Sequence, residues 1–222
     1  MQNLSIKINV DPELYLKNPD SSDLGQKIIS NSILLIDELG FEAFTFKKLS
    51  IKINSPESSI YRYFENKHTL LIYLTSWYWS WIEYKILLAT TNVEVTAEKL
   101  EKAIHVITKP VLVDQTISYI NEVVLDRIII AESVKAFHTK DVDKENKKGC
   151  FETYKYMVNR LAAMVLEVNP QYEYPRMLIS TVVEGAHQQR YFSEHLPALT
   201  DTKKGEDNIT TFYTQLVFNM IL

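Results

Sequence analysis

The chain has 222 residues, of which 46% are hydrophobic, so it can bury a full core. Only five glycines and seven prolines are present, too few to punctuate many short strands, and this scarcity favours long helices with few connections. The formal net charge of −4 excludes a globally basic protein, so any contact with nucleic acid requires a local patch.

The sequence predicts a protein of the reducing cytoplasm. The single cysteine, Cys150, cannot form an intrachain disulfide, and the first four residues lack the basic and then apolar pattern of a secretory signal. The most apolar stretch, 70–88, is too often interrupted by polar residues to span a membrane, which needs roughly 20 apolar residues. We interpret this stretch as part of a buried helix.

The N-terminal residues are expected to form an arm before the first helix. Residues 5–10 alternate polar and apolar side chains, a weak strand signal, and a cluster of turn-forming residues follows at 18–22. Helical spacing then begins after Asp23, with Ser22 or Asp23 as the candidate N-cap and Gly40 as the stop. The apolar residues with this spacing are Ile29, Ile33, Ile36 and Leu39.

Two short helices joined by a tight turn are expected next. Thr45 is a good N-cap for a helix over 46–53. Asn54 can adopt the left-handed conformation that a tight turn requires. Ser55 is then expected to cap a third helix that begins at Pro56 and runs to about residue 64. This order is that of a helix-turn-helix, in which the second short helix enters the major groove of DNA.

Longer helices are expected in the remainder of the chain. A fourth helix is expected from Lys67 through about Ala89. Further helices are predicted at 94–107, 111–124, 126–138, 143–168, 174–193 and 207–221. We therefore expect an all-α fold of about nine to ten helices, with a three-helix N-terminal module and a larger C-terminal helical bundle.

The third helix carries side chains suited to reading DNA. Ile60 and Phe64 are four residues apart and should face the core, so the side chains between them should point outward. Small residues at the start of this helix allow close approach to base edges, and Arg62 can form a forked contact with guanine or phosphate. Lys67 opens the next helix, where backbone N–H groups already favour a phosphate.

The stretch from about 24 to 71 resembles the TetR family of bacterial regulators. The resemblance is carried by Gly40-Phe41-Glu42-Ala43-Phe44-Thr45, by Lys47-Lys48-Leu49-Ser50, and by Ile60-Tyr61-Arg62-Tyr63-Phe64 with Lys67 and Leu70-Leu71. It implies a homodimeric repressor that reads a palindromic operator in double-stranded DNA and is released by a small-molecule effector. The domains it implies are an arm at 1–21, a DNA-binding domain at 22–66, and a ligand-binding and dimerisation domain at 67–222.

The same resemblance assigns roles to individual residues. By position in the motif, the phosphate-contacting residues are Lys47, Tyr61, Tyr63 and Lys67. The residues nearest the base edges are Ser58, Ser59 and Arg62. Tyr61 could instead be a half-buried residue that packs the module. Beyond about residue 76 the family is too divergent for any transfer.

Two positions depart from the family pattern. Asn54 replaces the usual glycine of the turn, and Glu57 lies where phosphates would disfavour a carboxylate. Glu57 either accepts a hydrogen bond from a cytosine amino group or weakens binding. The alternative function is therefore a dimeric protein-interaction module that has the fold but does not recognise a DNA sequence. A plain surface hairpin with solvated charges is the simplest competing interpretation.

Two sets of residues in the C-terminal body are candidates for ligand binding and dimerisation. Trp77, Trp81 and Tyr84 either pack the core or line a pocket for an apolar or aromatic effector. A stripe on the helix over 174–193 either packs the core or forms a symmetric four-helix interface between subunits. This stripe consists of Leu178, Val182, Gly185, Ala186 and Gln189.

An enzyme, a metal site and a cofactor are not expected. The five histidines are scattered, and the pairs Glu65-x-x-His68 and Glu184-x-x-His187 lack the further carboxylates of a di-metal bundle. The thiol of Cys150 follows two lysines but resembles an incidental cysteine. No glycine-rich phosphate loop or catalytic triad signature is visible.

Overall fold

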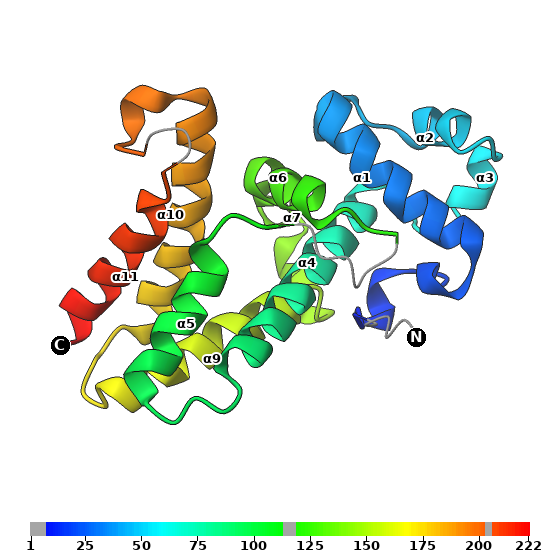
Figure 1. The fold of residues 1–222 in the computed structure, drawn as a ribbon. Coiled ribbons are helices and arrows are strands. Elements are labelled where there is room, and N and C mark those ends of the chain that lie inside the picture. The colour runs from blue at the N-terminus through cyan, green and yellow to red at the C-terminus, as the bar shows by residue number, and fades with distance from the viewer. Residues whose placement is uncertain (1–7, 113–118, 203–205) are drawn as a thin grey trace, which may run out of the picture. The chain divides into compact units, whose positions relative to one another are not determined.

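The computed structural model describes residues 8–112, 119–202 and 206–222. These parts of the chain form eleven α-helices and three short 3-10 helices and contain no strand, which confirms the predicted all-α class (Figure 1). The helices outnumber the expected nine to ten partly because two predicted helices are each split in two. The chain folds as two compact units, Met1–Ser80 with Val111–Glu152, and Trp81–Pro110 with Thr153–Leu222. The division falls within the fourth helix and does not coincide with the boundaries predicted at 21/22 and 66/67.

The first unit contains the N-terminal elements and a group of short helices from the middle of the chain. Its elements are η1 (Pro12–Leu14), η2 (Pro19–Ser21), α1 (Asp23–Ala43), α2 (Phe46–Lys52), α3 (Glu57–Ile60), the first part of α4 (Lys67–Thr90), α6 (Glu122–Glu132), α7 (Val134–Phe137) and α8 (Val142–Lys147). α1 packs against α2 and α6, and α2 packs against α3.

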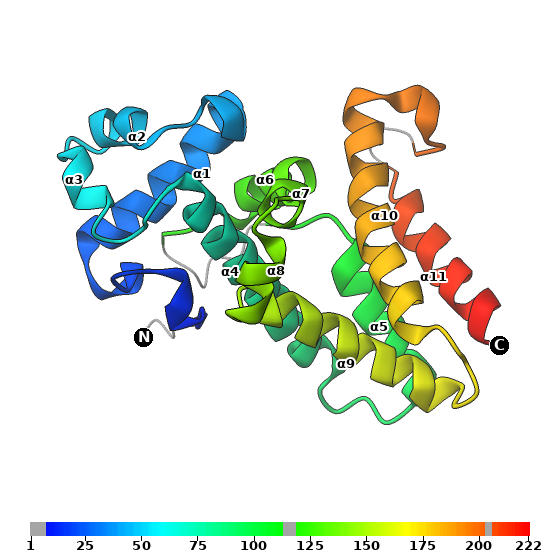
Figure 2. The same cartoon turned by 180° about the vertical axis from the view of Figure 1, so that it is seen from behind.

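The second unit is a helical bundle. It contains the end of α4, α5 (Thr96–Thr108), α9 (Glu152–Val168), α10 (Pro175–His195), η3 (Pro197–Leu199) and α11 (Asn208–Ile221). α10 and α11 lie side by side, and both pack against α5 (Figure 2). The apolar faces of these helices meet in a core where Ile104, Val183 and Val217 are completely buried.

Local hydrogen bonding sets the helix ends in the N-terminal region, as predicted. The hydroxyl of Ser22 caps α1 by accepting from the backbone N–H of Gly25, and Thr45 caps α2 by accepting from Lys48. Gly40 has a φ of +76°, which interrupts α1 at the position expected to stop it. Asn54 has a φ of +50°, so the turn after α2 uses the left-handed conformation.

The middle of the chain differs from the prediction. Of the helix expected at 111–124, the described residues 111–112 and 119–121 are irregular, and α6 begins only at Glu122, capped by Asn121. Residues 113–118 lie outside the described part of the chain. The helix expected at 126–138 is replaced by α6 and α7. The helix expected at 143–168 is interrupted at 148–151, where Gly149 has a φ of +87°. Residues 8–10 form no strand, and the rest of the predicted strand, 5–7, lies outside the described residues.

Polar contacts between described residues join α1 to α6 and α7 within the first unit. Asp37 forms an ion pair with Arg127 at 2.7 Å. The carboxylate of Glu132 accepts a hydrogen bond from the backbone N–H of Phe41 at 3.1 Å, just after the interruption at Gly40. Lys135 pairs with Glu42 at 3.1 Å and with Glu132 at 2.7 Å. The C-terminal end of α1 is therefore held by α6 and α7.

None of the helices in the described parts of the chain combines the length and apolar character that a membrane span requires.

Candidate nucleic-acid interface

α2, the turn at Asn54 and α3 form a compact helix-turn-helix. The backbone N–H of Ser55 donates to the carbonyl of Ser50 at 3.0 Å, which closes the turn. The prediction that Ser55 caps the third helix is wrong: Pro56 occupies the N-cap position, without a side-chain cap, and the helix begins at Glu57. The regular helix also ends at Ile60 instead of about residue 64, and 61–63 continue as turns. We call residues 57–64 the recognition segment.

The recognition segment has one buried side and one exposed side. Ile60 and Phe64 are completely buried, as their spacing predicted. Ser58 and Arg62 are exposed, and Ser59 is half-buried. Arg62 forms no ion pair with any residue that the structure describes, so its guanidinium faces solvent with its donors available.

Tyr61 packs the module, which is one of the two roles that the sequence left open, and its side chain remains partly exposed. Its side chain is 47% exposed, and the edge of its ring packs against Phe46 with centroids 5.2 Å apart. Its hydroxyl donates to the carboxylate of Glu57 at 3.2 Å. Partial desolvation and the Glu57 carboxylate together raise the pKa of the Tyr61 phenol. Glu57 therefore remains on the exposed side and engages a residue that was predicted to contact phosphate.

Tyr63 is buried, contrary to the exposed position that a phosphate-contacting residue requires. Its side chain is 2% exposed, and its hydroxyl lies 2.7 Å from that of Ser22. Burial alone would raise the pKa of the phenol. The hydrogen bond with Ser22 and the positive charges of Lys17 and Arg62 outweigh this effect and lower the pKa. Tyr63 thus links the recognition segment to the start of α1.

Lys67 also has a structural position. Its ammonium group donates to the carbonyls of Phe41, Glu42 and Phe44 at 2.9, 3.0 and 3.3 Å, which uses all three of its donors. Lys48 similarly donates to Ala43 at 2.7 Å. Both lysines therefore stabilise the carbonyl end of α1, where a helix favours a cation. Lys67 reaches a phosphate only by giving up these bonds.

Lys47 is the remaining predicted phosphate contact. Its side chain is exposed on α2 and forms no ion pair with any residue in the described ranges. Sequence reasoning missed a second exposed cation beside the recognition segment. Lys17 lies with its ammonium nitrogen 5.1 Å from the centre of the Tyr63 ring. No helical periodicity marks this position in the sequence, and only the Asp-Pro and Asn-Pro pairs around it indicated ordered turns.

The candidate ligand-binding aromatics are mostly buried. Trp77 is 1% exposed in the first unit. In the second unit Trp81 is completely buried beneath the ammonium group of Lys85, which lies 4.5 Å from the ring centre, and Tyr84 is half-buried. This burial agrees with the interpretation that the side chains of Trp77 and Trp81 pack the core.

The predicted dimer stripe on α10 lies largely inside its own subunit. Leu178, Val182 and Ala186 are at most 6% exposed, so these three side chains are core residues and are not available to a second copy. Gly185 allows the close approach of Tyr213 from α11, and Gln189 is half-buried. The exposed apolar side chains of α10 and α11 are instead Met177, Phe212 and Met220.

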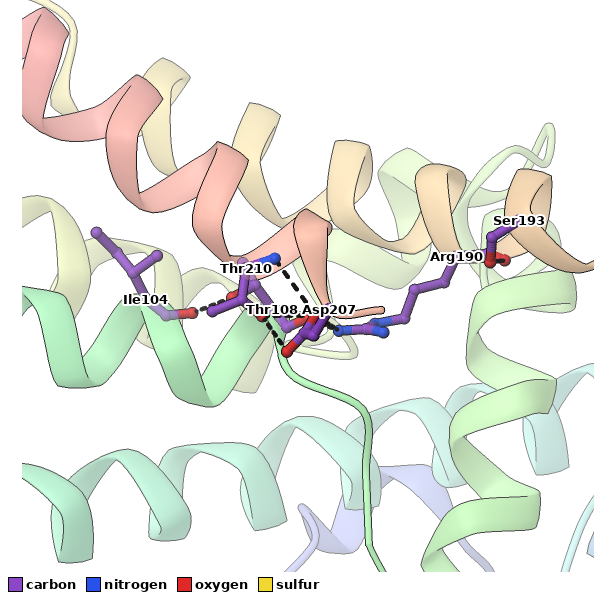
Figure 3. Close-up of polar contacts among 6 residues, drawn as sticks. All are labelled: Ile104, Thr108, Arg190, Ser193, Asp207 and Thr210. Atoms are coloured by element: carbon purple, nitrogen blue, oxygen red, sulfur yellow. Dashed lines mark hydrogen bonds and ion pairs between the residues drawn. The ribbon is translucent and has the colours of Figure 1, made fainter. Parts of the chain in front are cut away.

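A polar cluster that the sequence did not reveal joins α5, α10 and α11 (Figure 3). Arg190 donates to the carbonyl of Thr108 at the end of α5 and lies 3.5 Å from the carboxylate of Asp207. Asp207 caps α11 by accepting from the backbone and hydroxyl of Thr210. Burial and the charge of Arg190 lower the pKa of His187 to about 4, so this imidazole is neutral at physiological pH.

One member of each Glu-x-x-His pair forms a hydrogen bond with a residue outside the pair. The carboxylate of Glu184 accepts a hydrogen bond from Tyr154 at 2.6 Å, and His68 bonds to Glu145 at 2.9 Å. Among the described residues, no three His, Cys, Asp or Glu side chains are grouped as a metal ion would require.

Comparisons with known proteins relate the fold to that of solved structures. No protein-family model and no curated protein matches the chain. The fold is similar to that of the fatty acid degradation regulator FadR from Bacillus halodurans, with 15% identity, coverage of 94% of this chain and 96% of that chain, and a TM-score of 0.56. It is also similar to AibR in complex with isovaleryl coenzyme A and operator DNA, with 14% identity, coverage of 87% and 98%, and a TM-score of 0.59. The chain thus has the fold of these proteins, whereas the TetR resemblance rests on the sequence motif.

Proposed function

We propose that this protein is a transcriptional repressor of the TetR type that binds a palindromic operator as a homodimer. The observation that carries the proposal is the two-sided recognition segment, which buries Ile60 and Phe64 while exposing Ser58 and Arg62 directly after a helix-turn-helix turn. AibR, a protein with a similar fold, has been solved in complex with operator DNA, and this supports the proposal that the present chain binds an operator.

Each exposed residue has a role that its chemistry supports. Arg62 reads a guanine or grips a phosphate with its forked donors, and Ser58 and Ser59 allow the backbone to approach the bases. Lys47 and Tyr61 contact phosphates. Tyr63 and Lys67 act mainly by fixing the recognition segment and the end of α1, and Lys67 adds positive charge to the site.

We propose that an effector with an apolar or aromatic part binds beside α4, the helix that carries all three tryptophans, and releases the DNA. The AibR complex makes isovaleryl coenzyme A the first compound to test. The homodimer is proposed to form through the exposed apolar side chains of α10 and α11, namely Met177, Phe212 and Met220, because the buried stripe of α10 is occupied within the subunit.

The second candidate function is a dimeric interaction module that binds a protein. One observation favours it: the carboxylate of Glu57 lies on the exposed side of the recognition segment and holds the hydroxyl of Tyr61. A negative charge there opposes the approach of a phosphate backbone.

Selection from random double-stranded DNA at low salt, followed by mobility-shift titration, separates the two functions. The repressor proposal expects a palindromic sequence to emerge and expects Arg62→Ala to relax the preference at particular positions by about 1–3 kcal/mol. Lys140→Ala, which removes another exposed cation of the first unit, is the matched control and should leave the preference intact. Failure to select any sequence favours the interaction module.

The effector is tested separately with the selected operator. Isovaleryl coenzyme A is added to the preformed complex, and free coenzyme A serves as the control for the shared nucleotide part. Release by the acyl compound alone supports an effector recognised through its apolar group. Equal release by both compounds would contradict recognition of the effector through its apolar acyl group.

A further inference from the structure

Residues 8–21, the described part of the N-terminal arm, are an integral part of the first unit. Leu14 is 1% exposed, and Pro19 is buried. The backbone N–H of Leu16 donates to the carbonyl of Tyr63 at 2.8 Å, so the arm is bonded directly to the recognition segment. This bond joins the backbones themselves and fixes the position of the residues on either side of Leu16.

The arm is also ordered internally and tied at further points. Asp11 and Asn18 cap its two 3-10 turns, each with a proline at the first position. The ring of Tyr15 packs edge-on against Tyr73 of α4 at 6.1 Å. The carboxylate of Asp20 accepts a hydrogen bond from Tyr119. These contacts lie on both sides of Lys17, so the backbone that carries it is held in place.

Gly25 in the first turn of α1 shows how closely the arm is packed. A methyl group on Gly25 would overlap the backbone of Pro19, including its carbonyl oxygen. Backbone atoms cannot move aside as a flexible side chain can, so any larger residue at this position displaces the arm. The glycine therefore preserves a close contact between two backbones.

Lys17 is placed beside the recognition segment by these contacts. Its side chain is exposed, and its ammonium group lies over the ring of Tyr63, the neighbour of Arg62. The charges of Lys17 and Arg62 both act on the Tyr63 hydroxyl. Two cations from separate parts of the sequence thus gather at one end of the recognition segment.

We propose that the arm supplies Lys17 as a DNA-backbone contact that flanks the recognition segment and strengthens binding without reading sequence. The inference rests on the proposed function, because a duplex must lie against the recognition segment for Lys17 to reach it. A lysine is a compact point charge on a flexible stem, which suits a phosphate rather than a base edge. Neutralising one phosphate releases condensed counterions, so the contact has a measurable salt dependence.

The test is a mobility-shift titration of the full chain with its selected operator over a range of salt concentrations. Lys17→Ala is expected to weaken binding about three- to tenfold and to reduce the salt slope by about one, with the preferred sequence unchanged. Lys17→Arg, which keeps the charge, should restore both values. Lys140→Ala is the matched control and should change neither.

A second variant tests the role of the packing. Gly25→Ala should lower affinity and salt slope as Lys17→Ala does, because it displaces the arm, and combining the two substitutions should add little. Unchanged affinity and slope for Lys17→Ala, with reduced selectivity for Arg62→Ala, would overturn the role of the arm and leave the repressor proposal standing. If no operator is selected, the titrations are repeated with random duplex, and absence of any binding overturns both proposals.

Discussion

The ammonium nitrogen of Lys67 lies 2.9 Å from the carbonyl oxygen of Phe41, and it also donates to Glu42 and Phe44. Replacing Lys67 by methionine keeps the aliphatic stem but leaves the carbonyls of Phe41, Glu42 and Phe44, at the end of α1, without this donor. We expect Lys67→Met to lower the free energy of unfolding by about 1–3 kcal/mol, since hydrogen bonds to a charged group contribute about that much. Urea denaturation followed by circular dichroism measures the change.

Lys52→Met is the control for this stability measurement. Lys52 is exposed at the end of α2, and its removal should change the free energy of unfolding by less than about 0.5 kcal/mol. Equal stability of the Lys67→Met and wild-type proteins would show that the three bonds have no net effect on folding.

Glu57 is expected to weaken DNA binding. Its carboxylate lies on the exposed side of the recognition segment, where phosphates would approach, and it engages the hydroxyl of Tyr61. Glu57→Gln removes the charge and retains an acceptor for Tyr61. We expect affinity for duplex DNA to rise about three- to tenfold at low salt, and the gain to shrink as salt screens the repulsion.

The same titration on Glu94→Gln provides the control, because Glu94 is an exposed acid of the second unit. A Glu57→Gln protein that binds more weakly than wild type would mean that the carboxylate makes a favourable contact, such as accepting from a cytosine amino group.

The features that could be predicted from sequence are those governed by neighbouring residues. Ser22, Thr45 and Asn54 act as predicted because a cap or a left-handed turn depends on a few adjacent groups. Ser55 fails as a cap although its neighbours fit, since Pro56 itself takes the N-cap position and the helix starts one residue later.

Features that depend on distant partners could not be predicted. The apolar stripe through Val182 indicates burial but does not say whether the covering surface belongs to the same subunit or to another one. The positions of Tyr63 and Lys67 in the motif predicted contacts with phosphates. In the structure the hydroxyl of Tyr63 is hydrogen-bonded to Ser22, and the ammonium group of Lys67 is bonded to carbonyls at the end of α1. Lys17 was missed because only its long-range contact with Tyr63 distinguishes it from any other surface lysine.

Gly185 is expected to be necessary for the packing of α10 on α11. A methyl group at this position would overlap the hydroxyl of Tyr213 and crowd its ring. Gly185→Ala would ordinarily stabilise a helix by about 0.5–1 kcal/mol, but here we expect a net loss of about 1–3 kcal/mol because the core is overpacked. Thermal and urea denaturation report the change.

Tyr213→Phe tests whether this overlap is the cause. Removing the hydroxyl eliminates the closest contact, so the double variant should lose less stability than the sum of the two single variants. Additive losses would indicate that Gly185 acts through another neighbour.

His187 is expected to make the protein less stable in mild acid. Burial and the charge of Arg190 lower its pKa to about 4 in the folded protein, from about 6.5 in the unfolded chain. Between these values the unfolded chain binds a proton that the folded protein does not bind. The stability contributed by the neutral imidazole is therefore complete above pH 6.5 and is lost as the pH falls toward 4, by up to about 1.4 kcal/mol per pH unit.

Urea denaturation at several pH values between 4 and 7 measures this slope. His187→Gln removes the titrating group, so the free energy of unfolding should depend less steeply on pH than in the wild-type protein, whatever its absolute value. His195→Gln is the control, because it makes the same substitution at a histidine whose side chain is 56% exposed. Parallel pH profiles for the wild-type and His187→Gln proteins would mean that His187 is protonated equally in the folded and unfolded states, which its burial between helices beside Arg190 opposes.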